Sequence, residues 1–388
     1  MKVLLITSRN VYGTSGELRL IKNRTETLLH SYGVETDILL FKRDHVLNTK
    51  QEVFDYSSFN GVYYNWKNHI FRFRKFRALI KKKIQNEQYD AIIISGIFVL
   101  FNMAKYIKKV SPQIKVVLDI HGTLEELKEF SGKTFFQNAV RRFFYITSIK
   151  NQLNSIPVAD GYFVVSNALK NHINNKVKGL EKKDFFIIPC GIKEVEINKE
   201  ESLKYRAFYR EKYGLSDDVL LFIYSGGVSP WQCIEESVSL FKDFCAKSER
   251  KCKMLILSGN LNYISKFKSD DIITDSYSGD DVRKVLCAGD YAFLLRGDYM
   301  TNHVAYPNKF LEYVSSGMRI IATENVDDVA MQIRNYSVGT IVGFDDSLVN
   351  RLDNKPFEYL SDIEDRDSLL LATSFKTTLK PFVEYLKS

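Results

Sequence analysis

Short apolar runs of strand length alternate with helix-length segments along most of this chain, and the alternation starts twice. Strands that alternate with helices predict a parallel sheet, because each parallel strand needs a crossover connection before the next one. Uninterrupted apolar runs also suit strands that are covered on both faces. In the first half the predicted strands are Lys2–Thr7, Glu35–Phe41, Ala91–Ser95, Lys115–Ile120, Gly161–Val165 and Phe185–Ile188.

A charged segment that is poor in strand formers, Lys193–Gly214, separates the two series and contains a predicted helix, Lys199–Tyr213. We therefore predict an α/β protein with two doubly wound, Rossmann-like domains, residues 1–195 and 196–370. Residues 371–388 are expected to add an amphipathic helix. In the second half the predicted strands are Val219–Tyr224, Lys253–Leu257, Ile272–Tyr277, Tyr291–Leu295, Arg319–Ala322 and Gly339–Val342.

The net charge of +8 is divided unevenly along the 388 residues. Residues 1–195 contain 31 Lys and Arg against 17 Asp and Glu, whereas the remainder contains 24 against 30. Basic and aromatic residues are interleaved in Lys67–Lys83 and again in Phe135–Tyr145. Such segments suit an anionic membrane surface, nucleic acid, or a solvated helix whose aromatic side chains pack inward. We favour the membrane surface and rank nucleic acid last.

The sequence indicates a cytoplasmic protein that is peripheral at the inner face of a membrane. The first apolar run is too short for a signal peptide, and no run approaches the ~20 residues of a membrane span. The five cysteines lack metal-site spacing, and an odd number of cysteines without a signal peptide suits a reducing compartment. We interpret Cys190 and Cys287, which lie in or beside apolar runs, as buried structural thiols.

A short helix from Pro307 to Gly317 is the strongest candidate for a ligand site. Proline is favoured where a helix begins, and glycine just after a helix ends. Lys309 and Glu312 lie three residues apart, so they share one side of the first turns. A lysine at a helix N-terminus attracts phosphate, and a carboxylate one turn later can accept hydrogen bonds from sugar hydroxyls.

A strand that ends in Arg296, followed by Asn302 and then by the Pro-x-Lys-Phe-x-Glu-Tyr helix, resembles the family-4 retaining glycosyltransferases of the GT-B fold, in particular the bacterial polysaccharide type. The resemblance implies two domains that face each other across a cleft, with the last helix crossing back to the first. It also implies that Arg296, Asn302, Lys309 and Glu312 bind a nucleotide-diphosphate sugar. The sugar would pass, with retention of its anomeric configuration, to a glycan acceptor linked to a lipid diphosphate.

The sequence departs from this family at three positions. Many members carry a second glutamate where this chain has Val304, and an arginine and a lysine near the places of Val228 and Gln232. Gly226 and Gly227 end a predicted strand, where glycines permit backbone contact with phosphate. Because the two cations are missing there, Arg296 and Lys309 are expected to supply most of the positive charge that faces the diphosphate.

Further candidates end other predicted strands. His121 precedes Gly122 at the carboxyl end of Lys115–Ile120, where side chains point into the ligand crevice, and the resemblance implies a catalytic role for it. Gly13 and Gly16 after the first strand, and Ser258 and Gly259 in the second half, are weaker candidates. The resemblance also suggests that Cys190, in place of an asparagine, is a structural residue between the domains.

No Asp-x-Asp signature or other metal-ligand spacing is present, so we expect neither a metal nor any other cofactor. Two alternatives stay open. Sugar-nucleotide epimerases of the same fold also bind a nucleotide between two such domains. A catalytically silent partner that binds a nucleotide or a glycan is the second, since fold alone does not establish activity.

Overall fold

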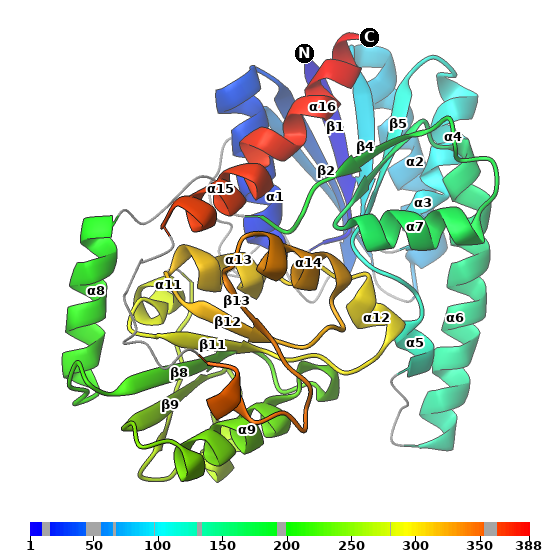
Figure 1. The fold of residues 1–388 in the computed structure, drawn as a ribbon. Coiled ribbons are helices and arrows are strands. Elements are labelled where there is room, and N and C mark those ends of the chain that lie inside the picture. The colour runs from blue at the N-terminus through cyan, green and yellow to red at the C-terminus, as the bar shows by residue number, and fades with distance from the viewer. Residues whose placement is uncertain are drawn as a thin grey trace. The chain divides into compact units, whose positions relative to one another are not determined.

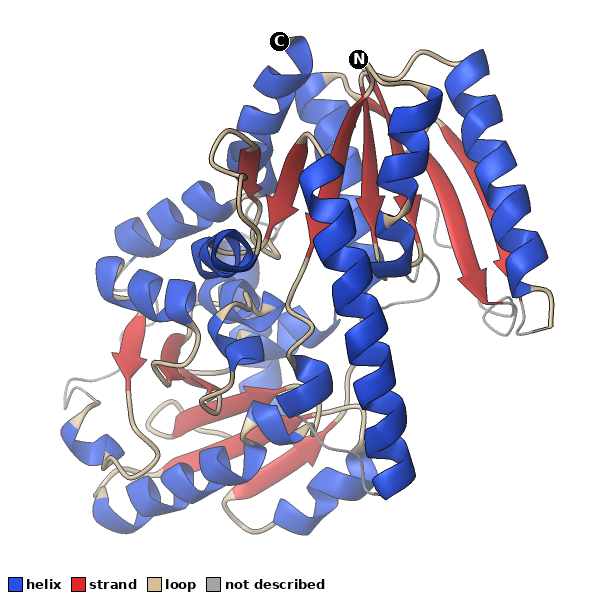
Figure 2. Cartoon of the chain, turned by 90° about the vertical axis from the view of Figure 1, so that its right-hand side faces the viewer, coloured by secondary structure: helices blue, strands red, loops and turns tan. Residues whose placement is uncertain are grey.

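The described residues of the computed structural model form two compact units, each built around its own parallel sheet. Unit 1 comprises Met1–Lys193 and Phe375–Ser388, and unit 2 comprises Glu194–Ser374. Figure 2 shows helices on both faces of each sheet, which confirms the predicted doubly wound class. The described residues are 1–9, 16–43, 56–64, 67–96, 98–129, 134–191, 199–279, 281–352 and 363–388.

The sheet of unit 1 has seven parallel strands in the order β3-β2-β1-β4-β5-β6-β7. Six of these strands coincide closely with the apolar runs of the sequence. The seventh, β3, is an edge strand that pairs with β2 only, and Asn60 and Gly61 interrupt its apolar residues. The strands are β1 (Lys2–Thr7), β2 (Glu35–Arg43), β3 (Ser58–Tyr64), β4 (Ala91–Ser95), β5 (Lys115–Ile120), β6 (Gly161–Val164) and β7 (Asp184–Ile187).

The helices of unit 1 divide between the two faces of this sheet. Right-handed crossovers place α1 on one face and the helices that connect β3 to β4, β4 to β5, β5 to β6 and β6 to β7 on the other. The helices are α1 (Gly16–Tyr32), α2 (His69–Asn86), α3 (Phe98–Phe101), α4 (Met103–Val110), α5 (Glu126–Glu129), α6 (Phe135–Ser155), η2 (Ile156–Val158), α7 (Asn167–Lys176) and α16 (Phe375–Lys387).

The C-terminal helix α16 packs into unit 1 although it follows unit 2 in the sequence. Figure 1 shows α16, in red, beside α1. Phe382 is completely buried, and its ring meets the Phe163 ring edge-on at a centroid distance of 4.8 Å. Phe186 adds a second edge contact at 5.6 Å. The helix therefore supplies part of the core of unit 1.

We predict that Phe382→Ala destabilises unit 1 by about 3–5 kcal/mol, because it leaves a cavity between α16 and the sheet. Amide hydrogen exchange in β1 and β6 should speed up accordingly. The matched control is Lys380→Ala on the exposed side of the same helix, which should change the free energy of unfolding by less than about 0.5 kcal/mol. Equal exchange rates in wild type and Phe382→Ala would contradict a core role for α16.

Unit 2 has six parallel strands in the order β10-β9-β8-β11-β12-β13. Phe222 on β8 packs against Phe241 and Phe244 of α9, and this contact covers one face of the sheet. The strands are β8 (Leu220–Ser225), β9 (Cys252–Leu257), β10 (Ile272–Asp275), β11 (Tyr291–Leu294), β12 (Arg319–Ala322) and β13 (Gly339–Ile341).

Asp290 joins the first helix of unit 2 to its sheet. Its buried carboxylate accepts hydrogen bonds from Arg206 of α8 and, at 2.7 Å, from the backbone N–H of Leu221. The helices are α8 (Lys199–Lys212), η3 (Pro230–Gln232), α9 (Ile234–Lys247), α10 (Leu261–Ile264), η4 (Ser265–Phe267), α11 (Asp281–Leu286), α12 (Met300–His303), α13 (Asn308–Ser315), α14 (Asp327–Asn335), η5 (Leu348–Asn350) and α15 (Ile363–Thr373).

Two further findings concern the membrane-span and cysteine predictions. None of the described helices combines the length and the apolar character that a membrane span requires. Cys245 and Cys252 are joined as a disulfide, whereas Cys190, Cys233 and Cys287 are free. The sequence did not indicate this pairing.

Candidate active site

In unit 1, His121 follows β5 and lies at the carboxyl edge of the sheet. Its Nε2 is 2.8 Å from Oδ1 of Asp119, the residue two positions earlier on the strand. Beside a carboxylate, Nε2 carries the proton, so Nδ1 is the acceptor of the ring. The backbone of Gly122 follows immediately and permits a tight exit from the strand.

The Asp119 carboxylate is buried and has partners on three sides. Arg24 of α1 donates to Oδ1 at 3.0 Å, and Ser95 at the end of β4 donates to Oδ2 at 2.7 Å. Arg9 in turn donates to the Ser95 hydroxyl at 2.9 Å. Two strand ends and one helix therefore fix the carboxylate that orients His121.

The charges around Asp119 determine the protonation of both residues. Burial opposes ionisation of the carboxyl group, but His121, Arg24 and Arg9 outweigh it and hold the pKa of Asp119 well below its usual range. Burial also lowers the pKa of His121 to about 4; Asp119 opposes this shift, and the Arg9 and Arg24 charges add to it. The imidazole is therefore neutral at pH 7 and suited to hydrogen bonding.

We predict that Asp119→Asn destabilises unit 1 by about 3–5 kcal/mol, since it leaves the buried Arg24 guanidinium without its carboxylate. The control is Asp184→Asn at an exposed position, which should cost less than about 0.5 kcal/mol. In ¹⁵N NMR spectra, Nε2 of His121 should carry the proton in wild type at pH 7, and the tautomers should mix in Asp119→Asn. An unchanged tautomer would show that Asp119 does not orient the ring.

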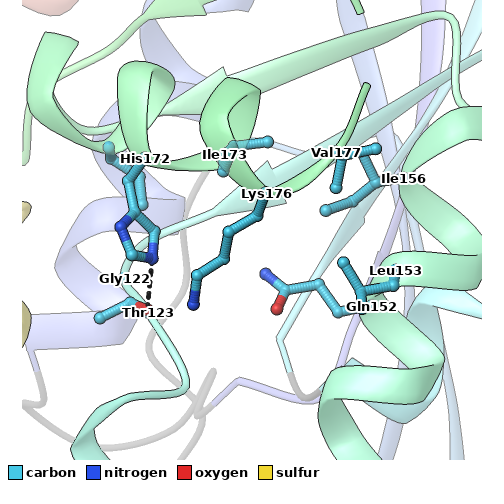
Figure 3. Close-up of a pocket in the computed structure, with 10 residues that line it drawn as sticks. Gly122, Thr123, Gln152, Leu153, Ile156, His172, Ile173, Lys176 and Val177 are labelled. Atoms are coloured by element: carbon cyan, nitrogen blue, oxygen red, sulfur yellow. Dashed lines mark hydrogen bonds between the residues drawn. The ribbon is translucent and has the colours of Figure 1, made fainter. Parts of the chain in front are cut away.

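A small pocket lies beside this edge, between Gly122 and α7 (Figure 3). Thr123 Oγ1 is 3.2 Å from Nε2 of His172, and Glu125 pairs with Lys176. The cavity volume of about 10 Å³ is roughly the least that can hold one water molecule, so the pocket is too small for a sugar. These polar side chains therefore anchor α7 to the end of β5.

In unit 2, Gly226 and Gly227 form the turn after β8. Tyr224 donates a hydrogen bond from its hydroxyl to the carbonyl oxygen of Gly227 at 2.6 Å. A Cβ atom added at Gly226 would collide with Nζ of Lys309, so the lysine ammonium lies directly against the glycine turn. The Gln232 amide lies at the same turn, with Oε1 3.0 Å from that Cβ position. A larger residue at position 226 would therefore displace the end of the lysine side chain.

Arg296 is 6% exposed and follows β11 at the same edge. Its backbone is fixed to the end of β12, because its N–H donates to Thr323 Oγ1 at 2.9 Å and its carbonyl oxygen accepts from that hydroxyl. The Asn325 amide donates to the same carbonyl oxygen at 2.9 Å. Asn302 is also buried, and its amide donates to the carbonyl oxygen of Gly297 at 2.9 Å. Asn302 thus holds the loop that follows Arg296.

Lys309 lies in the first turn of α13, against the glycine turn after β8. Burial lowers its pKa to about 7; the Arg296 charge lowers it further, and Glu312 opposes the shift. At neutral pH the Lys309 side chain is therefore protonated in about half of the molecules. An anionic ligand at the turn would favour the charged form and raise this pKa.

We predict that an anionic diphosphate ligand binds unit 2 more weakly as the pH rises from 7 to 9. Below the free pKa of about 7 the lysine is already charged, and above it Lys309 must take up a proton each time the ligand binds. Affinity should fall by up to about tenfold per pH unit until the pKa of the complex is reached. Calorimetry with UDP would measure this, and Lys309→Met should remove the dependence. A flat profile in wild type would contradict a role for Lys309 in binding.

The remaining candidates of unit 2 lie at the same edge. Ser258 and Gly259 follow β9, which pairs with β8, and Glu312 is half-buried on α13, the helix that carries Lys309. Gly16 is the first residue of α1, and Gly13 lies outside the described residues. Burial raises the pKa of the Cys190 thiol to about 11, so it is protonated at neutral pH and unsuited to nucleophilic attack.

The sequence did not indicate three of these contacts: Arg24 with Asp119, Thr323 with Arg296, and Gln232 with the glycine turn. The sequence indicated Gln232 only as a position where many family members carry a lysine. Its neutral amide lies against the glycine turn. No group of three or more His, Cys, Asp or Glu that could hold a metal ion is present within the part of the chain that the structure describes.

Comparison of the sequence with protein families identifies one match. The family described as Glycosyltransferase Family 4 matches residues 27–195, which lie almost entirely in unit 1 and include His121 and its partners Asp119 and Ser95. No curated protein matches the chain.

Solved structures resemble the whole chain at low sequence identity. Sucrose-phosphate synthase from Thermosynechococcus elongatus is 14% identical with a TM-score of 0.67, covering 100% of this chain and 97% of that one. WaaG, a glycosyltransferase involved in lipopolysaccharide biosynthesis, is 11% identical with a TM-score of 0.65 and full coverage of both chains. A glycosyltransferase from Rickettsia africae ESF-5 is 15% identical with a TM-score of 0.67, covering 100% and 97%.

At these identities the structures establish the fold alone, which is the two-domain GT-B fold. The family match over residues 27–195 adds sequence-level support from unit 1. Together they support a glycosyltransferase of the GT-B fold. They leave the donor, the acceptor and the stereochemistry to be argued from the site.

Proposed function

We propose that this protein transfers a sugar from a nucleotide-diphosphate sugar to a glycan acceptor linked to a lipid, with retention of the anomeric configuration. One observation carries the proposal: two cations, the buried Arg296 and the half-buried Lys309, lie at the edge of unit 2 that carries the Gly226–Gly227 turn. A buried cation is costly unless it meets an anion. A diphosphate supplies the matching charge.

The leaving diphosphate would be stabilised by charge and by hydrogen bonds. Arg296 offers a rigid fork of donors, and Lys309 a charged ammonium group against the glycine turn. The Gln232 amide and the backbone N–H of Gly227 add neutral donors. Glu312, one turn beyond Lys309, is placed on the helix to accept hydrogen bonds from ribose or sugar hydroxyls. Because the cations stabilise the developing charge, we propose that the reaction requires no metal.

In unit 1, we propose that His121 acts as a neutral hydrogen-bonding group toward the reacting sugar. Asp119 holds the ring with the proton on Nε2. Nδ1 is then available to accept a hydrogen bond from a hydroxyl. Retention rests on the family resemblance, and a lipid-linked acceptor rests on the basic charge of the first half.

The test begins with a thermal shift screen of UDP-, GDP- and ADP-sugars, because a ligand that binds only the folded state raises its apparent stability. Transfer is then measured with the best donor and lipid-diphosphate-linked glycans from a membrane extract. Lys309→Ala and Glu312→Ala should each reduce kcat/KM about 10- to 100-fold, the value of one charged hydrogen bond. The control is Lys284→Ala at an exposed ion pair of the same unit, which should leave the rate unchanged.

The outcomes distinguish three candidate functions. A glycosylated acceptor, formed at the same rate in EDTA, supports a metal-independent transferase. Interconversion of the sugar nucleotide without transfer would instead indicate an epimerase. Donor binding without turnover, combined with a cellular role that survives Arg296→Ala, would indicate a catalytically silent partner. Full activity in both Lys309→Ala and Glu312→Ala would contradict the proposed donor site.

A further inference from the structure

The helix α6 is exposed along almost its whole length. Among its 21 residues only Ser155 is buried. Seven of the eighteen large hydrophobic side chains exposed in the described part of the chain lie on this one helix. They include Phe135, 91% exposed, Phe136, 75% exposed, and Phe143, 64% exposed. An exposed apolar surface of this density marks an interaction site.

The exposed apolar side chains occupy one side of the helix. At 100° per residue, Phe135, Phe136, Val140, Phe143, Phe144, Ile146 and Leu153 fall within an arc of about 180°. We call these seven residues the apolar arc of α6. The helix contains no acidic residue, and its charged residues are Arg141, Arg142 and Lys150. A helix with this composition favours the interface of an anionic bilayer.

A groove of about 540 Å³ borders the apolar arc, between α5 and α6. Three cationic side chains line it, Lys128, Arg141 and Arg142, together with the polar groups of Asn138 and Tyr145. No acidic residue is part of the lining. Its volume and charge suit a phosphate or diphosphate group, and its apolar border suits the chain that such a group carries in a lipid.

Two side chains of the groove are fixed in place. The ammonium group of Lys128 lies 4.1 Å from the centroid of the Tyr145 ring. Arg141 donates from Nη2 to the carbonyl oxygen of Glu126 at 3.1 Å. Its Nε is buried and has no hydrogen-bond partner among the described residues. One hydrogen bond therefore holds the guanidinium group at the groove.

We propose that the apolar arc of α6 and the α5–α6 groove form one docking surface for an anionic membrane. The arc enters the interfacial layer of the bilayer, and the groove holds the phosphate of a lipid headgroup. This inference deepens the proposed function and rests on it, because it names the surface at which a lipid-linked acceptor reaches the enzyme.

The helix α2 fits this role less well than its sequence indicates. Phe76 is completely buried, and its ring packs on Phe41 at 4.7 Å. Phe73 also contacts Phe41, and Arg77 lies over the Phe73 ring. Of the three phenylalanines interleaved with basic residues, only Phe71 is largely exposed. Because most of its aromatic rings pack inward, α2 offers the membrane little apolar surface. It contributes exposed positive charge, and it lies on the same face of the sheet as α6.

Other occupants of the surface match it poorly. Nucleic acid is bound by cations with aromatic rings, but it offers no partner for Val140, Ile146 and Leu153. A second copy of the chain would bring the cations of one α6 against those of another, with no acidic residue on either helix. An anionic bilayer matches both the charge and the apolar area.

The experiment measures sedimentation of the full chain with vesicles, without donor or acceptor. Wild type should sediment with vesicles of phosphatidylcholine and phosphatidylglycerol in equal parts, but not with phosphatidylcholine alone, and high salt should release it. Arg141→Gln with Arg142→Gln should weaken partitioning about 30-fold, at about a factor of five per basic residue. Phe136→Ser with Phe143→Ser should weaken it by more than about tenfold.

The matched control comes from α8. Phe208→Ser, at a similarly exposed phenylalanine, should leave partitioning unchanged. Thermal shift by the donor should be the same in all variants, so loss of vesicle binding is separated from loss of the proposed function. Arg74→Gln with Lys75→Gln should weaken partitioning without changing how deeply α6 inserts.

Insertion is read directly from Phe143→Trp, whose fluorescence should be quenched by brominated lipid in the anionic vesicles. Phe208→Trp and Phe71→Trp provide the comparison. The proposal is overturned if Phe143→Trp is not quenched, or if wild type ignores the anionic vesicles at low salt. Equal quenching of Phe208→Trp would also overturn it, as would vesicle binding that survives both α6 double variants.

Discussion

All strands of each sheet run in the same direction, and this constraint decides where each unit can place charged groups. A parallel strand is covered on both faces, so its interior positions are apolar. Polar side chains that could meet a ligand therefore gather near the strand ends, and the carboxyl ends of all strands meet at one edge. In unit 1 this brings Ser95, Asp119 and His121 together from β4 and β5. In unit 2 it brings the glycine turn after β8 beside Arg296 after β11.

The two edges use buried charge in opposite ways. In unit 1 the Asp119 carboxylate already has Arg24 as its partner, so the network is closed and its function is to orient His121. In unit 2 the cations Arg296 and Lys309 lie together, and burial holds the pKa of Lys309 at about 7. Only Glu312 opposes that shift. This excess of positive charge at the edge of unit 2 supports the proposed diphosphate site.

The sequence predicted most of the fold because apolar runs identify buried strands without ambiguity. Twelve of the thirteen strands were predicted without knowledge of packing, but β3 was missed because an edge strand can tolerate Asn60 and Gly61. The candidate residues at strand ends could be found in the same way. Their partners could not be found: Arg24 is 95 residues from Asp119, and Thr323 is 27 residues from Arg296. Contacts of this range depend on the folded register of the sheet.

Chain connectivity links the edge of unit 1 to the docking surface. Lys128 in the α5–α6 groove follows His121 by seven residues, so the two lie at most about 25 Å apart. The glycan on a lipid whose phosphate occupies the groove would have to extend over no more than that distance to reach the imidazole. In the proposed function, the short segment between β5 and α6 would therefore serve both tasks. The proposed docking role would also give a reason for the length of α6 and for its lack of acidic residues, neither of which is needed to cover the sheet.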